Sequence, residues 1–263
     1  MKYKLTSTTK EYCGITLYQI QALRDFGCVI NVKKGDLGGW IEKETNLSQD
    51  NDCWVSDNAS VSDNARVSDN AWVSGNARVS GNARVSGNAR VSGNASVSGN
   101  ALVSGNALVF GDALVSDNAS VSDNARVSGD ARVSGNALVY DNALVSGNAL
   151  VFGDAWVSDN ASVSDNAKVS GDARVSGNAL VYGDAWVLGK LNLIGGYFYH
   201  YKEKSEEIEK IEVSDNYELL AKNPELAEEE KEVAKDLVDI RISRSTLEEL
   251  KKQGIKVKNK YEM

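Results

Sequence analysis

Val55-Ser-Asp-Asn-Ala-Ser60 is followed by Val61-Ser-Asp-Asn-Ala-Arg66, and the same six-residue frame continues to Trp186 without an insertion. The frame holds for 22 consecutive hexads, with valine in the first place and alanine in the fifth place of each. The third place is Gly or Asp, the fourth is Asn or Asp, and the sixth varies among Ser, Arg, Lys, Leu and Trp. A fixed short period of this kind is typical of a solenoid, so this stretch decides the fold.

Each hexad predicts one short strand and one corner. In Ala-x-Val the first and last side chains share a face, so alanine and valine point inward and the sixth residue points outward. Gly, Asp and Asn tolerate a left-handed backbone and therefore suit the corner. Because the inward pattern never reverses, the chain must wind into parallel coils that stack at about 4.8 Å. Asparagines at equivalent corners are expected to form side-chain amide ladders. If three hexads make one turn, the 22 hexads give just over seven coils.

The aliphatic residue followed four places later by a small one, as in Val55 with Ala59, resembles the hexapeptide-repeat proteins. That resemblance implies a three-sided, left-handed parallel β-helix. The stretch from Lys33 to Ile41 (KKGDLGGWI), the later Asn-Leu-Ser at residues 46–48, and the repeats themselves resemble the YdcK-like hexapeptide-repeat family. Members of that family are commonly encoded in phages and prophages, and the resemblance implies no established activity.

The flanks complete a mainly β fold with three predicted regions. Residues 1–40 are expected to form a small N-terminal β cap with strands at 2–5 and 17–23, residues 41–196 the β-helix, and residues 197–263 a small α+β segment. Within that last segment the pattern predicts helices at 225–238 and 245–254 and a short strand at 255–258. Ile41, Leu47 and Cys53 share the phase of the inward alanines, so the coil should begin near residue 40, with Cys53 a buried, unreactive thiol.

Composition narrows the class of function. The chain has 263 residues and a formal net charge of -8, without the concentrated basic face that nucleic-acid binding requires. No stretch has the roughly 18 apolar residues of a membrane span, and the first residues lack the apolar core of a signal peptide. The three cysteines have no metal-type spacing, which favours free thiols in a reducing compartment. We therefore expect a cytoplasmic protein that binds neither nucleic acid nor membrane.

Catalysis has little support in the sequence. Hexapeptide acyltransferases are expected to use a histidine near a loop that interrupts the coil, whereas these repeats contain neither. His200 is the single histidine and lies beyond the repeats. The corner aspartates interchange with Gly and Asn, which favours corner conformation over the converging oxygen ligands of a calcium site. We expect no catalytic residue, no cofactor and no metal.

The outward positions carry apolar residues in bands, each about one turn long. One band and the aromatic run after the repeats form the candidate partner-contact surface: Leu138, Tyr140, Leu144, Leu150, Phe152, Trp156, Tyr197, Phe198 and Tyr199. Clustered exposed aromatic residues favour recognition. The alternative is that these are ordinary surface residues, since isolated exposed leucines are common.

The sequence thus predicts a phage- or prophage-type solenoid that binds or scaffolds, with a protein partner such as a host defence protein. Analogy with other hexapeptide proteins predicts a homotrimer. Two other functions stay open: an acyltransferase-like enzyme that uses His200, and an acidic mimic of a nucleic-acid duplex. The mimic is disfavoured by eight basic residues at outward positions of the repeats.

Overall fold

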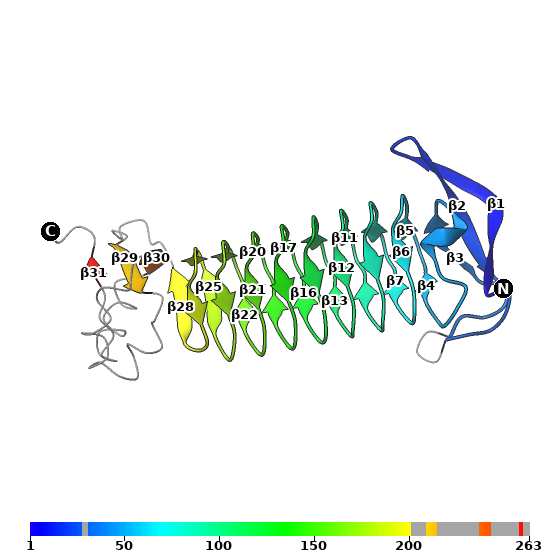
Figure 1. Cartoon of the computed structure of the whole chain (residues 1–263). Helices are drawn as coiled ribbons and strands as arrows, with labels where there is room; N and C mark the ends of the chain where they lie inside the picture. Colours follow the sequence, from blue (N-terminus) through cyan, green and yellow to red (C-terminus); the bar gives the residue numbers. More distant parts are fainter. Residues whose placement is uncertain (28–30, 201–208, 215–236, 243–257, 260–263) are drawn as a thin grey trace.

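A computed structural model describes residues 1–27, 31–200, 209–214, 237–242 and 258–259. Stacked coils form a long solenoid, and the N-terminal hairpin lies at one end of it (Figure 1). Successive hexads place their strands in three different parallel sheets, so that each sheet is one face of the solenoid. The mainly β, parallel solenoid predicted from the repeat is confirmed.

We name the faces in the order in which the repeats reach them, starting from Val55. The first face contains β4 (Trp54–Val55), β7 (Trp72–Val73), β10 (Arg90–Val91), β13 (Leu108–Val109), β16 (Arg126–Val127), β19 (Leu144–Val145), β22 (Ser162–Val163), β25 (Leu180–Gly183) and β28 (Tyr197–His200). The second face contains β3 (Leu37–Ile41), β5 (Ser60–Val61), β8 (Arg78–Val79), β11 (Ser96–Val97), β14 (Leu114–Val115), β17 (Arg132–Val133), β20 (Leu150–Val151), β23 (Lys168–Val169) and β26 (Trp186–Val187). The third face contains β6 (Arg66–Val67), β9 (Arg84–Val85), β12 (Leu102–Val103), β15 (Ser120–Val121), β18 (Leu138–Val139), β21 (Trp156–Val157), β24 (Arg174–Val175) and β27 (Asn192–Leu193).

The solenoid has about nine turns, because β3 extends it before the repeats and β27 and β28 extend it after them. Neighbouring strands pair in parallel at a spacing of 18 residues through the repeats, as in Arg90 opposite Leu108. Every repeat valine and alanine is buried, with at most 2% of its surface exposed. The interior predicted from the inward valines and alanines is therefore continuous along the repeats.

The corners depend on the third place of each hexad. Its backbone is left-handed throughout, with φ of 67° at Gly87 and 56° at Asp63, which explains why only Gly and Asp occur there. Adjacent coils approach closely at this point, since a Cβ added to Gly87 would lie 2.8 Å from the Gly105 carbonyl oxygen. Where aspartate occupies the place, its carboxylate can accept the amide of the next coil, as Asp63 does from Gly81 at 2.9 Å.

The fourth-place asparagines form the predicted amide ladders, and these ladders have a direction. Each amide nitrogen donates to the carbonyl oxygen 18 residues later, for example Asn82 Nδ2 to Asn100 Oδ1 at 2.9 Å. One ladder runs from Asn58 to Asp112, a second from Asn64 to Asp154, and a third from Asn70 to Asn178.

The ends of the first two ladders carry complementary charges. Lys10 and Lys43 donate to the opening oxygens, at 2.9 Å and 3.4 Å respectively. Asp112 and Asp154 accept from the last amide, each at 2.8 Å. An aspartate can accept but has no hydrogen to pass on, so it ends the series. Aspartate in the fourth place therefore ends a ladder at residues 112 and 154.

The first coil departs from the register read in the sequence. Ile41 pairs with Val61 and Leu47 bridges to Val67, so these two residues take the place of valines, whereas Cys53 keeps the place of an alanine. The coil that follows β3 and the 3-10 helix η1 (Glu44–Asn46) is thus two residues longer than the others. All three side chains are nevertheless buried, as expected.

The N-terminal cap closes the solenoid. β1 (Tyr3–Tyr12) and β2 (Ile15–Ala22) form an antiparallel hairpin, and β2 pairs with β3 to join the second face. The buried Lys2 ammonium fills the longer turn of the first coil and donates to the carbonyl oxygens of Asp50, Asn51 and Cys53 at 3.2, 3.3 and 2.8 Å. The predicted β cap is confirmed, with longer strands than expected.

Beyond the repeats, β26 pairs with β30 (Leu237–Ile242), which pairs with β29 (Glu209–Ser214), and β29 pairs with β31 (Lys258–Asn259). The predicted helix at 245–254 and most of the one at 225–238 lie outside the described residues. The last two residues of the latter prediction, Leu237 and Val238, belong to a strand instead.

Candidate binding surfaces

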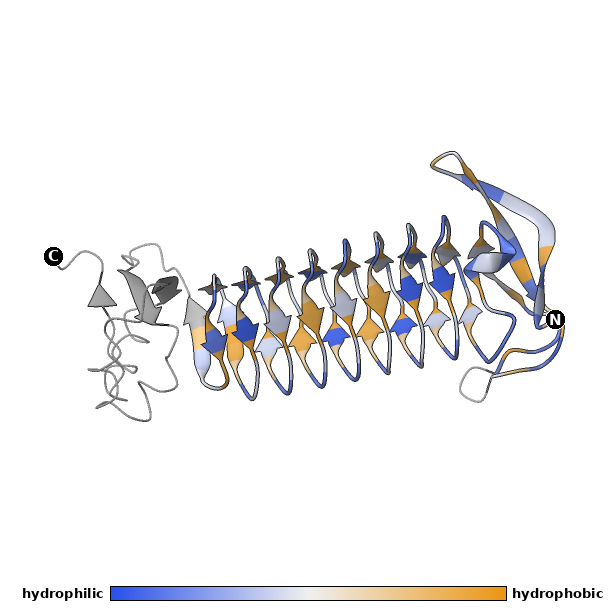
Figure 2. Cartoon of the chain, viewed as in Figure 1, coloured by the Kyte–Doolittle hydropathy of each residue, from blue (hydrophilic) through white to orange (hydrophobic). Residues whose placement is uncertain are grey.

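The apolar band around residues 138–156 encircles the solenoid. Leu138 and Trp156 are adjacent on the third face, while Leu144 lies on the first face and Leu150 on the second. Neither of the latter two has an apolar neighbour on its own face, since Leu144 lies between Arg126 and Ser162, and Leu150 between Arg132 and Lys168. Figure 2 shows this interleaving of hydrophobic and hydrophilic strand positions.

Two aromatic residues of the band lie at corners, directly after a buried valine. Phe152 is exposed, at 39%, and Tyr140 is partly exposed. The only buried serines among the described residues, Ser158 and Ser170, come one coil after Tyr140 and Phe152. We infer that each ring covers the serine of the next coil, so part of each ring contributes to the stability of the solenoid.

The aromatic run after the repeats is only partly available for contacts. Tyr197 is 67% exposed beside Leu180 on the first face. Phe198 is buried, at 4%, and does not belong to a contact surface. The reason is a coil one residue shorter than the 18-residue coils of the repeats, which pairs Phe198 with Val181 and gives it the inward place of a valine. The backbones of Tyr199 and His200 end β28, and their side chains lie outside the description.

Tryptophans at outward positions lie against cations of the adjacent coil. The guanidinium of Arg174 is 4.2 Å from the ring centroid of Trp156, and that of Arg90 is 5.7 Å from Trp72. The Lys168 ammonium is 4.3 Å from the ring of Trp186. Such contacts are worth about 0.5–1 kcal/mol at exposed sites. They orient the rings and leave Trp156 only partly exposed.

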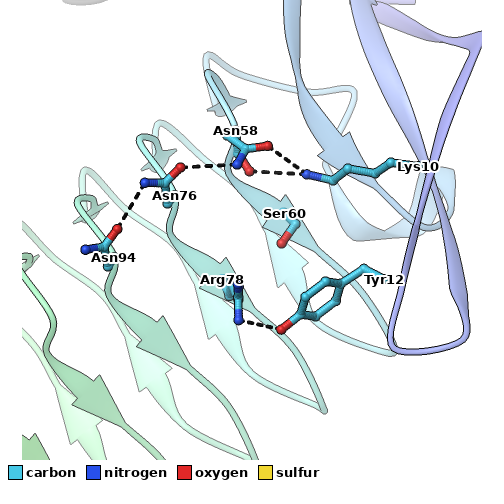
Figure 3. A pocket seen from close by; sticks show the side chains of 7 residues that line it. All are labelled: Lys10, Tyr12, Asn58, Ser60, Asn76, Arg78 and Asn94. Atoms are coloured by element: carbon cyan, nitrogen blue, oxygen red, sulfur yellow. Dashed lines mark hydrogen bonds between the residues drawn. The ribbon is translucent and has the colours of Figure 1, made fainter.

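A groove of about 370 Å³ lies between the N-terminal hairpin and the solenoid (Figure 3). Its walls are Lys10 and Tyr12 from β1, and Asn58, Ser60, Asn76, Arg78 and Asn94 from three successive coils. Lys10 contacts the Asn58 oxygen and lies 4.5 Å from the Trp40 ring centroid. Arg78 donates to the Tyr12 hydroxyl, with its guanidinium 4.5 Å from that ring's centroid. These contacts hold the hairpin tip over the second face.

The groove is cationic. The structure describes a single ion pair, Lys33 with Asp25, so neither Lys10 nor Arg78 has a described carboxylate within ion-pair distance. Burial lowers the pKa of Lys10, and the neighbouring Arg78 guanidinium lowers it further. Two unpaired cations therefore face one space on a chain with a net charge of -8.

A second hollow of about 470 Å³ lies near the other end of the solenoid. It is lined by Asp154, Trp156, Asp172, Arg174, Lys190 and Asn192. Carboxylates and cations occur together there, so the charges of this hollow offset one another.

Two buried titratable groups lie together at the N-terminal cap. Lys2 Nζ lies 3.1 Å from Cys53 Sγ, and both side chains are almost completely buried. Burial lowers the pKa of Lys2 and raises that of the Cys53 thiol. Among the residues that the structure describes, no three His, Cys, Asp or Glu side chains are grouped so as to hold a metal ion. In the same part of the chain, no helix has the length and apolar character needed to cross a membrane.

The chain is a β-solenoid repeat protein, because it has three faces of parallel strands around a closed aliphatic interior. A family model described as YdcK Beta solenoid repeat matches residues 59–75, 71–85, 77–93, 83–99, 131–146, 143–159 and 173–189. The repeats of this chain are therefore similar to the YdcK β-solenoid repeat over these residues, as the motifs indicated. A search of the curated proteins finds no match.

The groove was not anticipated from the sequence. The strand predicted at residues 2–5 ends before Lys10 and Tyr12, and no pattern in the repeat indicates that a hairpin will lean over the second face. Alternation of residues in a long hairpin rich in threonine and lysine predicts strands, but not the direction in which they project.

Proposed function

We propose that this protein acts by binding another protein, with the solenoid as a rigid scaffold that presents contact residues and performs no catalysis. The observation that carries the proposal is the position of Leu138 and Trp156, side by side on the third face outside a closed interior. An aliphatic residue beside a tryptophan is typical of the anchors that contribute most to protein interfaces. Phe152, exposed at a neighbouring corner, extends the same band.

The partner we propose is a protein of the host cytoplasm, such as a component of its defence, because YdcK-like proteins are common in phages. Nucleic acid and membrane are not proposed as ligands, since a net charge of -8 disfavours both phosphate backbones and anionic lipids. The alternative is that the same apolar band forms the interface of a homotrimer.

Quantitative capture from the lysate of the expressing cell tests the surface. The variant Leu138→Ser, Trp156→Ser should lose the captured protein, whereas Leu102→Ser, which changes an exposed leucine elsewhere on the third face, should retain it. Equal recovery by both variants would contradict the role of the band. Sedimentation of the purified proteins separates the alternatives, since a homotrimer that dissociates only in the Leu138, Trp156 variant would assign the band to self-association.

The absence of catalysis is tested separately. Wild type and His200→Ala are incubated with acyl-coenzyme A donors and a panel of amine and hydroxyl acceptors. We expect no turnover above the background in either protein. Turnover that disappears with the substitution would contradict the proposal and make the protein an acyltransferase.

A further inference from the structure

The groove beneath the N-terminal hairpin has hydrogen-bond donors and positive charge but no described anion of its own. We propose that it binds carboxylate side chains of an acidic, extended segment of a protein partner. The choice of a protein as the source of the carboxylates rests on the function proposed above. The groove is separate from the apolar band, because it is formed by residues 10–94 at the N-terminal end of the second face.

The available donors define the ligand as an anion. Asn76 already donates to Asn94 at 3.0 Å, and Asn94 to Asp112 at 2.8 Å, so these amides form a wall and have few hydrogens to offer. The remaining donors are the ammonium of Lys10, the unused N–H groups of Arg78 and the hydroxyl of Ser60. A guanidinium presents a planar fork that matches both oxygens of a carboxylate, and an ammonium adds a second point of attraction.

Electrostatics favours occupation of the groove. Lys10 and Arg78 repel one another across it, which is why the guanidinium contributes to the lowered pKa of Lys10. A carboxylate between them relieves this repulsion and exchanges it for two attractive contacts. Arg84, on the third face, is also exposed but does not line this groove.

The dimensions suit an extended chain. The wall crosses three successive coils, at Asn58, Asn76 and Asn94. Two coil spacings amount to roughly 10 Å, which is the length of about three residues of a β-strand. Carboxylates at alternate positions of such a strand point to the same side. An acidic segment with Glu or Asp at positions i and i+2 can therefore direct two carboxylates at the cations.

The test uses fluorescein-labelled, end-blocked hexaglutamate, with hexaglutamine as the uncharged probe, and measures fluorescence anisotropy at low ionic strength. Hexaglutamate should bind and hexaglutamine should not. Arg78→Gln and Lys10→Gln should each weaken binding about fivefold, the loss expected for one partly exposed charged contact. Arg78→Lys should recover part of the affinity. The matched control Arg84→Gln removes one exposed arginine outside the groove and should leave the affinity unchanged.

Several results would overturn the proposal. Equal binding of the two peptides, or equal weakening by Arg84→Gln and Arg78→Gln, would show that the groove does not select carboxylates. Binding of inorganic phosphate without binding of hexaglutamate would identify a different anion site. Far-ultraviolet circular dichroism of each variant ensures that a loss of affinity is not a loss of fold.

Failure of the groove proposal can be distinguished from failure of the proposed protein-binding function. If hexaglutamate does not bind but capture still depends on Leu138 and Trp156, the groove proposal fails and the binding function stands. If hexaglutamate binds through Arg78 and capture does not depend on Leu138 and Trp156, the groove proposal stands and the proposed role of the apolar band fails.

Discussion

Replacing Asn88 by aspartate tests whether the direction of the asparagine ladders stabilises the solenoid. Asn88 lies inside the third ladder, where it accepts from Asn70 at 3.1 Å and donates to Asn106 at 3.0 Å. The matched control is Asn178→Asp at the end of the same ladder, since Asn178 accepts from Asn160 at 3.4 Å and has no described amide acceptor after it. Both residues follow a glycine, are exposed, and have an aspartate one coil earlier that accepts that glycine's amide.

The two substitutions change the charge equally but differ in the hydrogen bonds they remove. Aspartate can still accept from the preceding amide at either site. At residue 88 it loses the bond to Asn106, worth about 0.5–1 kcal/mol net at an exposed site, and it sets a carboxylate oxygen against a carbonyl oxygen, at a further cost of about 0.5 kcal/mol. Asn88→Asp should therefore lower the free energy of unfolding by about 1–1.5 kcal/mol, whereas Asn178→Asp should change it by less than about 0.5 kcal/mol.

Thermal unfolding followed by far-ultraviolet circular dichroism measures the difference. A protein of this size loses about 2–4 °C in Tm for each kcal/mol, so Asn88→Asp should melt roughly 2–6 °C below wild type. The Tm of Asn178→Asp should lie close to that of wild type. Equal Tm values for the two variants would refute the reasoning, because charge alone would then account for the effect and the direction of the ladder would not matter.

Three further predictions concern the corner, the core and the cap. Gly87→Ala should lower the free energy of unfolding by about 2 kcal/mol, because φ is 67° and the new Cβ meets the Gly105 oxygen. Gly87→Asp should lower it by about 1 kcal/mol less, because the carboxylate can accept the amide of the next coil. Chemical denaturation that shows the alanine variant to be more stable than the aspartate variant would contradict this. Val121→Ala removes buried methyl groups from the middle of the solenoid and should cost about 2–3 kcal/mol in the same measurement, while a loss below about 1 kcal/mol would show that the coils close around the gap. In a variant with the other two cysteines replaced by serine, Cys53 should react with a maleimide only as fast as the protein unfolds, because its thiol is buried and its pKa is raised. Rapid labelling of the native protein, measured by mass spectrometry, would disprove the burial of Cys53.

The sequence predicts the repeats almost completely because each hexad repeats one local solution. Valine and alanine at fixed places define the interior, and Gly or Asp at the third place defines the corner, so the strands and the ladders follow from spacing. The three faces were implied by the resemblance to hexapeptide-repeat proteins. What spacing could not predict lies where the period breaks. A coil with two extra residues gives Ile41 the place of a valine, and a coil with one residue fewer brings Phe198 into the core.

The candidate surfaces were predicted less well for a related reason. Outward residues are not constrained by the core, so the sequence shows which ones are apolar but not how much of each ring is covered by its neighbours. The arginine against Trp156 comes from the next coil, and only the observed pairing of strands shows that the two side chains meet. The groove depends on where Lys10 and Tyr12 are carried by a hairpin whose orientation no repeat determines.

The hydrogen bonds between coils, such as those from Arg90 to Ala107 and from Ser92 to Val109, have a mechanical consequence. They join one coil to the next, so a load applied between the two ends of the solenoid acts on every interface between coils in series. Extension should then proceed by peeling single coils, each releasing the length of an 18-residue segment, or roughly 60–65 Å of contour. A single molecule pulled by its two ends should extend in small, evenly spaced steps at low force, one coil at a time, and should not unfold in one event.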